Sequence, residues 1–263
     1  MAYGSSAVGE TYAPVGIENE TGAGGFVFLC EHASNYIPPS MGTLGLDSEA
    51  LSSHIAWDPG ALGVARALAG LLDSPLVASG LSRLLIDCNR ETDAPDLIPV
   101  RSELTDIPGN ADLDEAARRH RINLAHVPFH AAAEAVISAR CAAGLRPAVV
   151  SLHSFTPVYK GVSRPWEIGL IHDRDPALAA PVLKALADTT THVVGDNEPY
   201  SPADGVFYSL DRHAQSLGLP HLMIEIRNDL LKTPAQEQGW ARLLAPLLKD
   251  ALAGLDRSGG THA

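Results

Sequence analysis

Four short apolar runs of this sequence are each followed by side chains that could bind a metal, bind a carboxylate or move a proton. The runs and these side chains are Phe26–Cys30 with His32, Leu84–Ile86 with Asn89 and Arg90, Ala148–Leu152 with His153, and Leu222–Ile224 with Glu225. Short apolar runs bounded by polar turns are typical of buried strands. Open α/β sheets place their working groups beyond the carboxyl ends of such strands. The set suits a metal-dependent hydrolase of carboxylate-bearing substrates.

Two of these residues, His32 and His153, are the candidate metal ligands. A single histidine at a strand end is more often structural, but two in similar contexts indicate a zinc site, which needs neutral imidazoles from separate rigid elements. Hydrolytic zinc sites usually add a carboxylate. Asp58, just before Pro59, is the first candidate and Glu31 the second. Asp58 could instead be the N-cap of a helix that begins at Pro59.

Glu225 lies in the apolar run Leu-Met-Ile-Glu-Ile, which is expected to be a buried strand. Burying a carboxylate costs several kcal/mol unless it is paired or its pKa rises. One role that requires such a residue is that of a general base, which takes a proton from the attacking water of a metal-dependent hydrolase. The alternative is a salt bridge to Arg227 or to another arginine.

Asn89 and Arg90 are the candidate substrate-binding pair. A guanidinium can hold a carboxylate through two parallel hydrogen bonds, and a neighbouring amide can add a third. Arg83 could polarise the carbonyl of the bond to be cleaved, although it could equally be a surface arginine. Asp87 is expected to orient one of these arginines.

His126 and His130 are four residues apart, a spacing that on a regular helix would suit a metal site. Pro128 lies between them and interrupts the helical pattern of residues 112–144. We therefore expect two helices, or one with a sharp kink near Val127, and interpret His126 as structural.

Strands and helices alternate along the chain, which predicts a single α/β domain with a largely parallel sheet. The expected strands are 26–30, 75–79, 83–87, 148–152, 166–172, 192–195 and 220–226, and the expected helices are 47–53, 62–72, 112–144, 176–190, 209–217 and 234–255. Residues 1–24 are expected to be a loose tail or an edge segment, 25–255 the α/β hydrolase domain, and 256–263 a C-terminal tail. The proline- and acid-rich loop 91–111 is long for a compact domain and suggests a lid.

Composition narrows the class of partner. The formal net charge is −12 and the isoelectric point is near 5.3, which argues against nucleic acid and anionic membranes as partners. Neither a secretory signal nor an apolar run of membrane-spanning length is present, and the three cysteines fit reduced, packed thiols. We expect a cytoplasmic protein. Nucleophile-elbow, Walker and dinucleotide motifs are absent from the sequence, which disfavours serine hydrolases, nucleotide-binding enzymes and dehydrogenases.

Five motifs stand out in the sequence, namely Glu31-His-Ala-Ser-Asn-Tyr-Ile-Pro38, Trp57-Asp-Pro-Gly-Ala61, Ser82-Arg-Leu-Leu-Ile-Asp-Cys-Asn-Arg90, Ser151-Leu-His-Ser154 and Ile224-Glu-Ile-Arg-Asn228. Together they resemble the N-formylglutamate amidohydrolase family, in a divergent branch, over about residues 25–250. The Asp-x-Asn-Arg and Leu-His-Ser motifs are also similar to those of zinc carboxypeptidases and acyl-amino-acid deacylases.

The resemblance implies a three-layer α/β/α sandwich around a mixed, mostly parallel sheet, like that of the zinc carboxypeptidases. It implies roles for particular residues, namely Asn89 and Arg90 in carboxylate binding, His153 in metal binding and Glu225 in catalysis. Phe129-His130 resembles an aromatic-histidine pair of the family, so His130 is a further candidate for substrate binding.

One departure concerns the metal. Carboxypeptidases supply two ligands as His-x-x-Glu, whereas this chain has His32 and Asn35 at those positions. Asparagine is a poor zinc ligand, so Asp58 is the expected replacement. The sequence therefore predicts one divalent metal, zinc first, and hydrolysis of the amide of a small N-acyl amino acid such as N-formylglutamate. The alternatives are a carboxypeptidase-like hydrolase of short peptides and a metal-free binding or regulatory protein.

Overall fold

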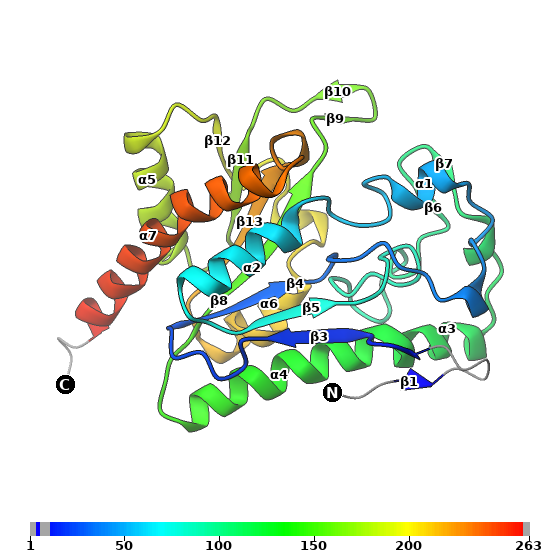
Figure 1. The fold of residues 1–263 in the computed structure, drawn as a ribbon, viewed down its shortest axis with the longest axis horizontal. Helices are drawn as coiled ribbons and strands as arrows, with labels where there is room; N and C mark the ends of the chain where they lie inside the picture. The colour runs from blue at the N-terminus through cyan, green and yellow to red at the C-terminus, as the bar shows by residue number, and fades with distance from the viewer. Residues whose placement is uncertain (1–3, 6–10, 260–263) are drawn as a thin grey trace.

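The computed structural model describes residues 4–5 and 11–259, and its centre is a seven-stranded mixed sheet. Across the sheet the strand order is β12 (Val194–Asp196), β11 (Ile168–Ile171), β13 (His221–Arg227), β8 (Ala148–Phe155), β4 (Phe26–Cys30), β5 (Leu76–Ser79) and β3 (Val15–Glu18). The central neighbours are parallel, as are β11 and β12, whereas β13 with β11 and β5 with β3 are antiparallel. The expected mostly parallel sheet is confirmed (Figure 1).

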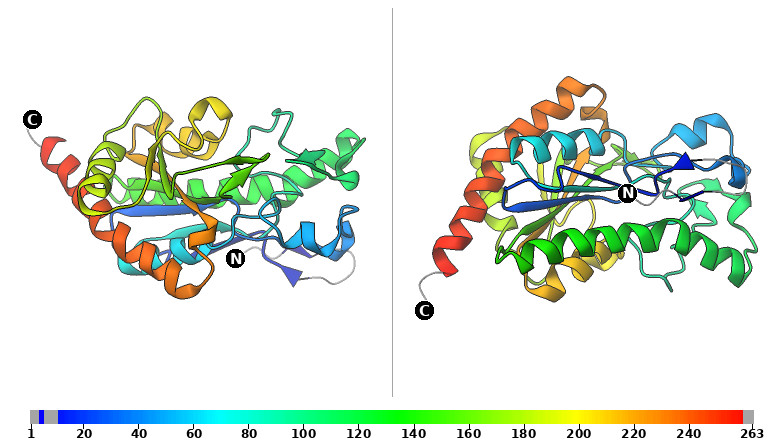
Figure 2. Two further views of the ribbon diagram at one scale, coloured as in Figure 1. Left: turned by 90° about the horizontal axis from the view of Figure 1, so that it is seen from above. Right: turned by 60° about the horizontal axis from the view of Figure 1, so that its bottom comes forward.

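Helices cover both faces of this sheet. Those in the described residues are α1 (Ser48–Ser52), α2 (Ala61–Leu71), α3 (Glu115–Arg121), α4 (Val127–Ala142), α5 (Ala179–Thr189), α6 (Tyr208–His213) and α7 (Pro234–Gly259). Figure 2 shows the sheet between α4 on one side and α2 with α7 on the other, so the three-layer α/β/α sandwich is confirmed. No helix in this part of the chain is both long and apolar enough to cross a membrane.

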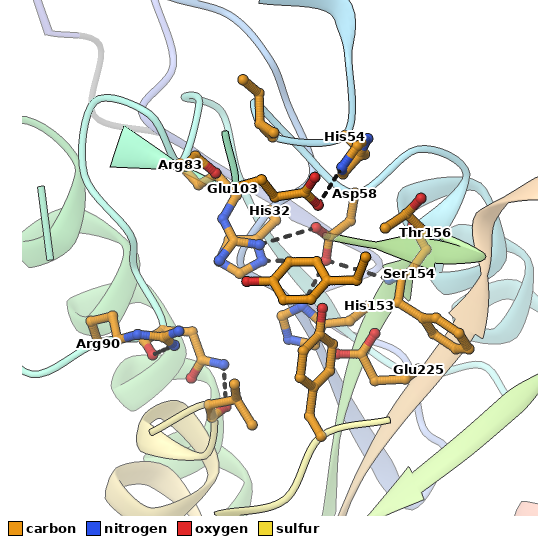
Figure 3. Close-up of a pocket in the computed structure, with 17 residues that line it drawn as sticks. His32, His54, Asp58, Arg83, Arg90, Glu103, His153, Ser154, Thr156 and Glu225 are labelled. Atoms are coloured by element: carbon orange, nitrogen blue, oxygen red, sulfur yellow. Dashed lines mark hydrogen bonds and ion pairs between the residues drawn. The ribbon is translucent and has the colours of Figure 1, made fainter. Parts of the chain in front are cut away.

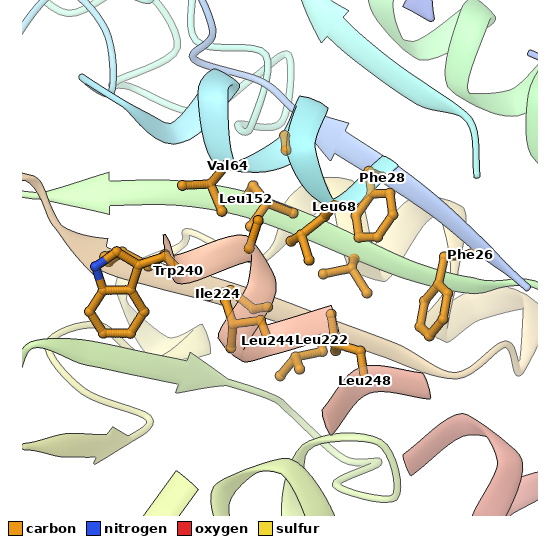
Figure 4. Packing of buried hydrophobic residues seen from close by; sticks show 14 of the residues in the cluster. Phe26, Phe28, Val64, Leu68, Leu152, Leu222, Ile224, Trp240, Leu244 and Leu248 are labelled. Atoms are coloured by element: carbon orange, nitrogen blue, oxygen red, sulfur yellow. The ribbon is translucent and has the colours of Figure 1, made fainter. Parts of the chain in front are cut away.

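Side chains that alternate along the strands pack into two separate apolar cores, one on each face of the sheet. Leu152 and Ile224 pack under α2, α5 and α7, together with Trp240 and Leu244 of α7 (Figure 4). Their strand neighbours point to the opposite face, where α4 and α6 cover them. Because side chains alternate along a strand, a polar residue placed between two residues of the first core must face the second layer. This parity puts His153 and Glu225 on the face covered by α4 and α6.

The predicted strand at 83–87 is wrong. Residues 82–89 form buried turns with no partner in the sheet, although Leu84, Leu85 and Ile86 are almost fully buried. The segment is held by irregular bonds, among them Arg83 N to Ala56 O at 3.2 Å and Asp87 N to Leu97 O at 2.8 Å. A short apolar run reports burial and not backbone conformation, which explains the error.

The remaining differences are at the ends of elements. Strand β8 runs on to Phe155, so His153 lies within it. The break before Pro128 is confirmed as a π-helical turn, Ile122–His126, between α3 and α4. The N-terminal stretch contributes the edge strand β3. Helix α7 continues to Gly259, beyond the expected start of the tail at 256, and residues 1–3, 6–10 and 260–263 lie outside the described residues.

Two short hairpins project beside the sheet. One pairs β6 (Arg101–Ser102) with β7 (Thr105–Asp106), inside the loop expected to be a lid. The other pairs β9 (Val158–Tyr159) with β10 (Val162–Ser163), directly after β8. A further pair, β1 (Gly4–Ser5) and β2 (Thr11–Tyr12), lies near the N-terminus.

Candidate active site

Strand register brings the predicted catalytic residues together. His153 and Glu225 are direct partners on the parallel strands β8 and β13, so their side chains share one face of the sheet. His32 follows β4, the neighbour of β8 on its other side. Asp58 comes from the turn before α2, and its backbone N–H donates to His32 O at 3.0 Å. Figure 3 shows the resulting cluster.

His32, Asp58 and His153 form a buried group whose ligand atoms all lie within 4.8 Å of one another. The Nδ1 atoms of His32 and His153 lie 3.2 and 2.8 Å from the same oxygen of Asp58. The side chain of Asp58 is fully engaged here, so the alternative that it caps α2 is wrong. Asn35, the site of the departure from His-x-x-Glu, is exposed and donates to Leu51 O.

The other ring nitrogens of the two histidines also face carboxylates. His32 Nε2 lies 2.7 Å from Asp87, and His153 Nε2 lies 2.9 Å from Ser151 Oγ and 3.3 Å from Glu31. With acceptors at both ring nitrogens, the two histidines donate from Nδ1 to Asp58 when no metal is bound, and a metal that displaced the Nδ1 protons would meet both lone pairs at one point. Outer carboxylates orient metal-bound histidines in this way. Glu31 thus pairs with His153, and the group of candidate ligand atoms includes Asp58 in its place.

Arg83 joins two of these carboxylates. Its Nη2 donates to Asp87 at 2.7 Å and its Nη1 lies 3.4 Å from Asp58. Asp87 therefore orients an arginine, as expected, and a candidate metal ligand as well. Three buried carboxylates, Glu31, Asp58 and Asp87, surround this centre, and Arg83 is the only permanently charged cation paired with them in the described residues. The excess negative charge suits a divalent cation.

The electrostatics of the centre follow from these contacts. Burial alone would raise the pKa of Asp58, but the charge of His32 and hydrogen bonds from both histidines hold it well below its usual range. Burial likewise opposes charge on Glu31, yet the hydrogen bond from His153 lowers its pKa to about 2. Burial lowers the pKa of His153, but the hydrogen bonds and charges of Asp58 and Glu31 outweigh it and raise that pKa well above its usual value. A metal at Nδ1 would replace the proton that this pairing favours.

Glu225 is the exception, a buried carboxylate without a salt bridge. Its Oε2 atom has no hydrogen-bond partner in the described residues, and the neighbouring Arg227 pairs with Asp229 at 2.8 Å. The alternative of a structural pair with Arg227 is therefore wrong. Burial, together with the charge of Asp58, raises the pKa of Glu225 to about 7. Such a value is that of a group able to accept and return a proton near neutral pH.

A cavity of about 160 Å³ opens onto this cluster. Its lining residues come from the candidate metal-binding group, the segment 83–90, the end of β8, the β9–β10 hairpin and the loops 91–111 and 196–208. They include His32, Asp58, Arg83, Asn89, Arg90, Glu103, His153, Tyr159, Tyr200 and Glu225. Glu103 of the 91–111 loop reaches His54 on the opposite rim, with His54 Nε2 at 2.8 Å from its carboxylate. A cavity this small suits a small, polar substrate.

Asn89 and Arg90 both line the cavity, but they differ in how many of their hydrogen-bonding groups are left for a ligand. The Asn89 amide donates to Val206 O and accepts from Ser209 N at 3.0 Å, so it is largely committed to the protein. Arg90 donates through Nε to Asp96 at 2.7 Å and through Nη1 to two backbone carbonyls. Its Nη2 makes no hydrogen bond to the described residues and remains available to a ligand.

His130, expected to bind substrate, does not line the cavity in this part of the chain. It supports the segment 88–90 through a chain of imidazoles, because His213 Nε2 donates to His130 Nδ1 at 2.8 Å and His130 Nε2 donates to Cys88 O at 2.9 Å. His126 Nε2 donates to Arg90 O at 3.0 Å, and its ring centroid lies 4.3 Å from that of His130. Pro128 does not disturb the spacing of the two rings, because it lies in the first turn of α4, where a helix tolerates proline.

Sequence patterns missed several residues of the cavity, among them His54, Glu103, Tyr159 and Tyr200. They lie on loops or hairpins, where no periodicity marks a side chain as inward-facing. The signal that could have found two of them is loop length. Glu103 lies in 91–111 and Tyr200 in the proline- and acid-rich loop 196–208, and long loops in compact domains are usually functional.

The histidine chain should make stability depend on pH. Burial lowers the pKa of His130 to about 2 and that of His213 to about 4, whereas an unfolded histidine titrates near 6.5. Below about pH 6.5 the unfolded chain therefore binds more protons than the folded one, and stability falls as pH falls. Replacing His213 with Gln removes one such group, so the slope between pH 6 and 4.5 should decrease by up to about 1.4 kcal/mol per pH unit.

Urea unfolding of wild type and His213→Gln at pH 4.5, 5.5 and 7.5 measures this difference. His120→Gln, an exposed histidine of α3, is the matched control and should retain the wild-type slope. Equal slopes for wild type and His213→Gln would mean that His213 is not held neutral in the folded protein.

Comparison with known proteins places this site in a family. A family model described as N-formylglutamate amidohydrolase matches residues 24–232. The crystal structure of a gene product from Agrobacterium tumefaciens is 47% identical, with a TM-score of 0.90 over 92% of this chain and 96% of that one. The crystal structure of N-formylglutamate amidohydrolase from Ralstonia eutropha shares the fold, at 22% identity and a TM-score of 0.66 over 92% of this chain and 99% of that one. Among curated proteins there is no significant match.

The family match spans the motifs that contain His32, Asp58, Arg90, His153 and Glu225, and the fold of the relatives agrees with the three-layer sandwich described above. This chain belongs to the N-formylglutamate amidohydrolase family.

Proposed function

We propose that this protein is a metal-dependent amidohydrolase that cleaves the N-acyl amide of a small, carboxylate-bearing amino acid. Its main support is the convergence of two Nδ1 atoms on one oxygen of Asp58, with the unpartnered carboxylate of Glu225 beside them. N-formylglutamate is the first candidate substrate, since the family model and the Ralstonia relative bear that name. The small cavity favours such a molecule over the peptides that a carboxypeptidase-like enzyme would take.

His32, Asp58 and His153 would hold the metal. Two imidazole nitrogens and one carboxylate oxygen form a donor set that hydrolytic zinc enzymes use, and Asp87 and Glu31 supply the outer partners that fix both rings. When bound, zinc supplies a Lewis acid that polarises a carbonyl and makes water more acidic. Arg83, placed between Asp58 and Asp87, keeps both carboxylates charged and in position.

Glu225 is the proposed general base. With a pKa raised to about 7, it is partly ionised at neutral pH and can take a proton from the attacking water. The same carboxyl group then returns that proton to the amine nitrogen as the C–N bond breaks. Its strand position beside His153 supports this role, and the absence of an arginine partner among the described residues leaves it free to change charge.

Arg90 is the proposed carboxylate-binding residue. Arg90 lines the cavity, its Nη2 makes no hydrogen bond to the described residues, and the bonds to Asp96, Asn89 O and Gly205 O hold the guanidinium in a fixed orientation. Asn89 contributes mainly by fixing this segment against Val206 and Ser209. His130 supports the same segment from behind the cavity wall and is proposed to act on substrate binding only through it.

The test of the function is amine release by the metal-loaded protein. Purified without chelator, the wild type should contain about one divalent metal per chain and release glutamate from N-formyl-, N-acetyl- or N-succinylglutamate. His153→Ala should lose most of the metal and the activity, because two ligands rarely retain zinc. His120→Ala is the control and should match wild type. A protein that holds no metal and hydrolyses none of these amides would be the binding or regulatory protein instead, and release from dipeptides alone would indicate a peptidase.

Glu225→Gln tests the general base. The amide keeps the shape of the side chain but cannot accept the proton, so kcat should fall by about two to four orders of magnitude with the metal retained. The raised pKa means that burying the charged form costs stability as pH rises from the unfolded value toward 7 and above. In metal-free protein the variant should therefore gain stability over wild type at pH 8 more than at pH 5.

Kinetics, metal analysis and urea unfolding at both pH values check these expectations. Glu134→Gln, an exposed glutamate of α4, serves as the control. A Glu225→Gln protein that unfolds readily at pH 8 but turns over substrate normally when folded would assign Glu225 a structural role.

Arg90→Lys tests carboxylate recognition. Lysine keeps the charge but loses the planar guanidinium, so kcat/KM for the free-carboxylate substrate should fall about tenfold or more. The corresponding α-carboxamide substrate should react poorly with wild type and be little affected by the substitution. If Arg90→Lys matches wild type and the carboxamide reacts as well as the acid, Arg90 does not recognise the substrate.

A further inference from the structure

One wall of the cavity is built around a buried arginine. Arg164 is 8% exposed, and its guanidinium lies over the rings of Tyr159, Tyr200 and Phe155, at 4.4, 4.7 and 5.8 Å from their centroids. These three aromatic residues line the cavity, whereas Arg164 itself lies behind them. The arrangement fixes the wall, because cation–π contacts orient the rings around one planar group.

The hydrogen bond between Arg164 and Tyr200 leaves the hydroxyl proton of Tyr200 available to another partner. Arg164 Nη1 lies 3.0 Å from the hydroxyl oxygen of Tyr200. A guanidinium has donors only, so the phenol oxygen must be the acceptor in this bond. The hydroxyl proton is then left over, and no hydrogen bond to the described residues uses it. Tyr200 is half-buried and lines the cavity, so a ligand there could accept this proton.

Amide hydrolysis needs such a donor. As the water oxygen bonds to the carbonyl carbon, the carbonyl π electrons move onto the oxygen, which acquires negative charge. Donors held in place before the reaction stabilise that charge. Arg83, expected from the sequence to polarise this carbonyl, directs both Nη groups at Asp58 and Asp87. Arg90 is held at Asp96 and is assigned to the substrate carboxylate.

We propose that Tyr200 is a catalytic hydrogen-bond donor to the carbonyl oxygen of the amide that is cleaved, and that Arg164 is its positioning residue. The inference rests on the proposed function. Tyr200 shares the cavity with Asp58, His153 and Glu225, on a loop that sequence patterns did not connect to the site. It keeps its proton throughout, while Glu225 accepts the proton of water and gives it to the departing amine. When the C–N bond breaks, the electron pair on oxygen re-forms the carbonyl of the released acid.

The protonation state of Tyr200 fits this role. Burial, with a contribution from the nearby charge of Glu225, raises the pKa of Tyr200 to about 12, so the phenol remains protonated wherever Glu225 can act as a base. The guanidinium at its oxygen does not compete for that proton. A neutral donor also avoids pairing with Glu225, which must stay free to exchange its own proton.

Tyr200→Phe removes the hydroxyl and keeps the ring. In metal-loaded enzyme that hydrolyses an N-acyl amino acid, we expect kcat to fall about 100-fold, with KM changed less than threefold and with metal content and melting temperature unchanged. Tyr208→Phe is the matched control, because the Tyr208 hydroxyl also accepts from an arginine, Arg212 at 2.9 Å, but lies outside this cavity. It should retain wild-type kinetics.

A second measurement does not depend on turnover. A phosphinate analogue of the tetrahedral species should bind Tyr200→Phe about 100-fold more weakly than wild type, whereas the amino-acid product should bind both equally. Arg164→Lys should lower kcat in the wild-type background and have little further effect in Tyr200→Phe, as expected of a residue that acts through the phenol.

The outcomes separate this inference from the function beneath it. An active wild type whose Tyr200→Phe variant keeps its kcat and its phosphinate affinity overturns the role of Tyr200 alone. A parallel loss in kcat and in product affinity would mean that Tyr200 binds substrate without favouring the transition state, which also overturns it. A wild type that holds metal but hydrolyses no N-acyl amino acid overturns the proposed function and this inference with it.

Discussion

The polar centre of this protein depends on one buried carboxylate, Asp58. A single oxygen of its side chain lies within 3.2 Å of His32 Nδ1 and 2.8 Å of His153 Nδ1, and the other oxygen faces Arg83. A buried charge is tolerated only when such partners compensate for lost solvation, and removing one partner from such a cluster typically costs about 3–5 kcal/mol. The contacts of both Nδ1 atoms with one oxygen of Asp58 stabilise the cluster in the folded chain. They also direct both Nδ1 atoms at one point, where a metal could bind them. Stability and metal-binding geometry therefore come from one set of contacts.

The sheet makes this convergence possible. Strands β4, β8 and β13 are parallel neighbours, so their carboxyl ends deliver His32, His153 and Glu225 to the same edge. The alternation of side chains sends Leu152 and Ile224 into the apolar core under α2 and α7, and their polar neighbours to the opposite face. Small changes of register would break the site, because shifting a strand by one residue reverses the face of every side chain.

The family assignment and the fold are consistent with one another. The structure also explains why the first motif carries Asn35 and not a glutamate. Where the zinc carboxypeptidases that some of its motifs resemble have a glutamate in the first motif, this chain has Asn35, which the structure places on the surface. Asp58 occupies the centre instead, tied to His32 by a backbone hydrogen bond as well as through its side chain. A carboxylate is thus present in the candidate metal-binding group although the first motif lacks one. The unpaired Glu225 beside it completes a site that is costly to bury and useful for proton transfer.

Sequence alone determined the fold class and the principal residues of the site. The periodic apolar runs predicted the α/β architecture, and polar residues at the ends of those runs identified His32, His153 and Glu225 as residues that the structure brings together. These predictions rest on local properties, since burial and the position of a strand end are encoded in neighbouring residues. The predicted strand at 83–87 failed for the same reason. Leu84 to Ile86 are buried as their composition requires, but whether a buried segment pairs with a sheet depends on partners elsewhere in the chain.

Only the tertiary structure decided which of the site residues contact one another. The sequence ranked Asp58 before Glu31 as the candidate ligand, but only the distances between segments show that Asp58 contacts both histidines while Glu31 pairs with His153 from the other side. The contact of His126 with His130 depended on where α4 begins, and the hydrogen bond of Tyr200 to Arg164 joined two loops that are distant in the sequence. Hydrogen bonds and shared charges act through space over a few ångströms. Residues that are distant in the chain acquire these interactions only when folding brings them together, so no local pattern of the sequence records them.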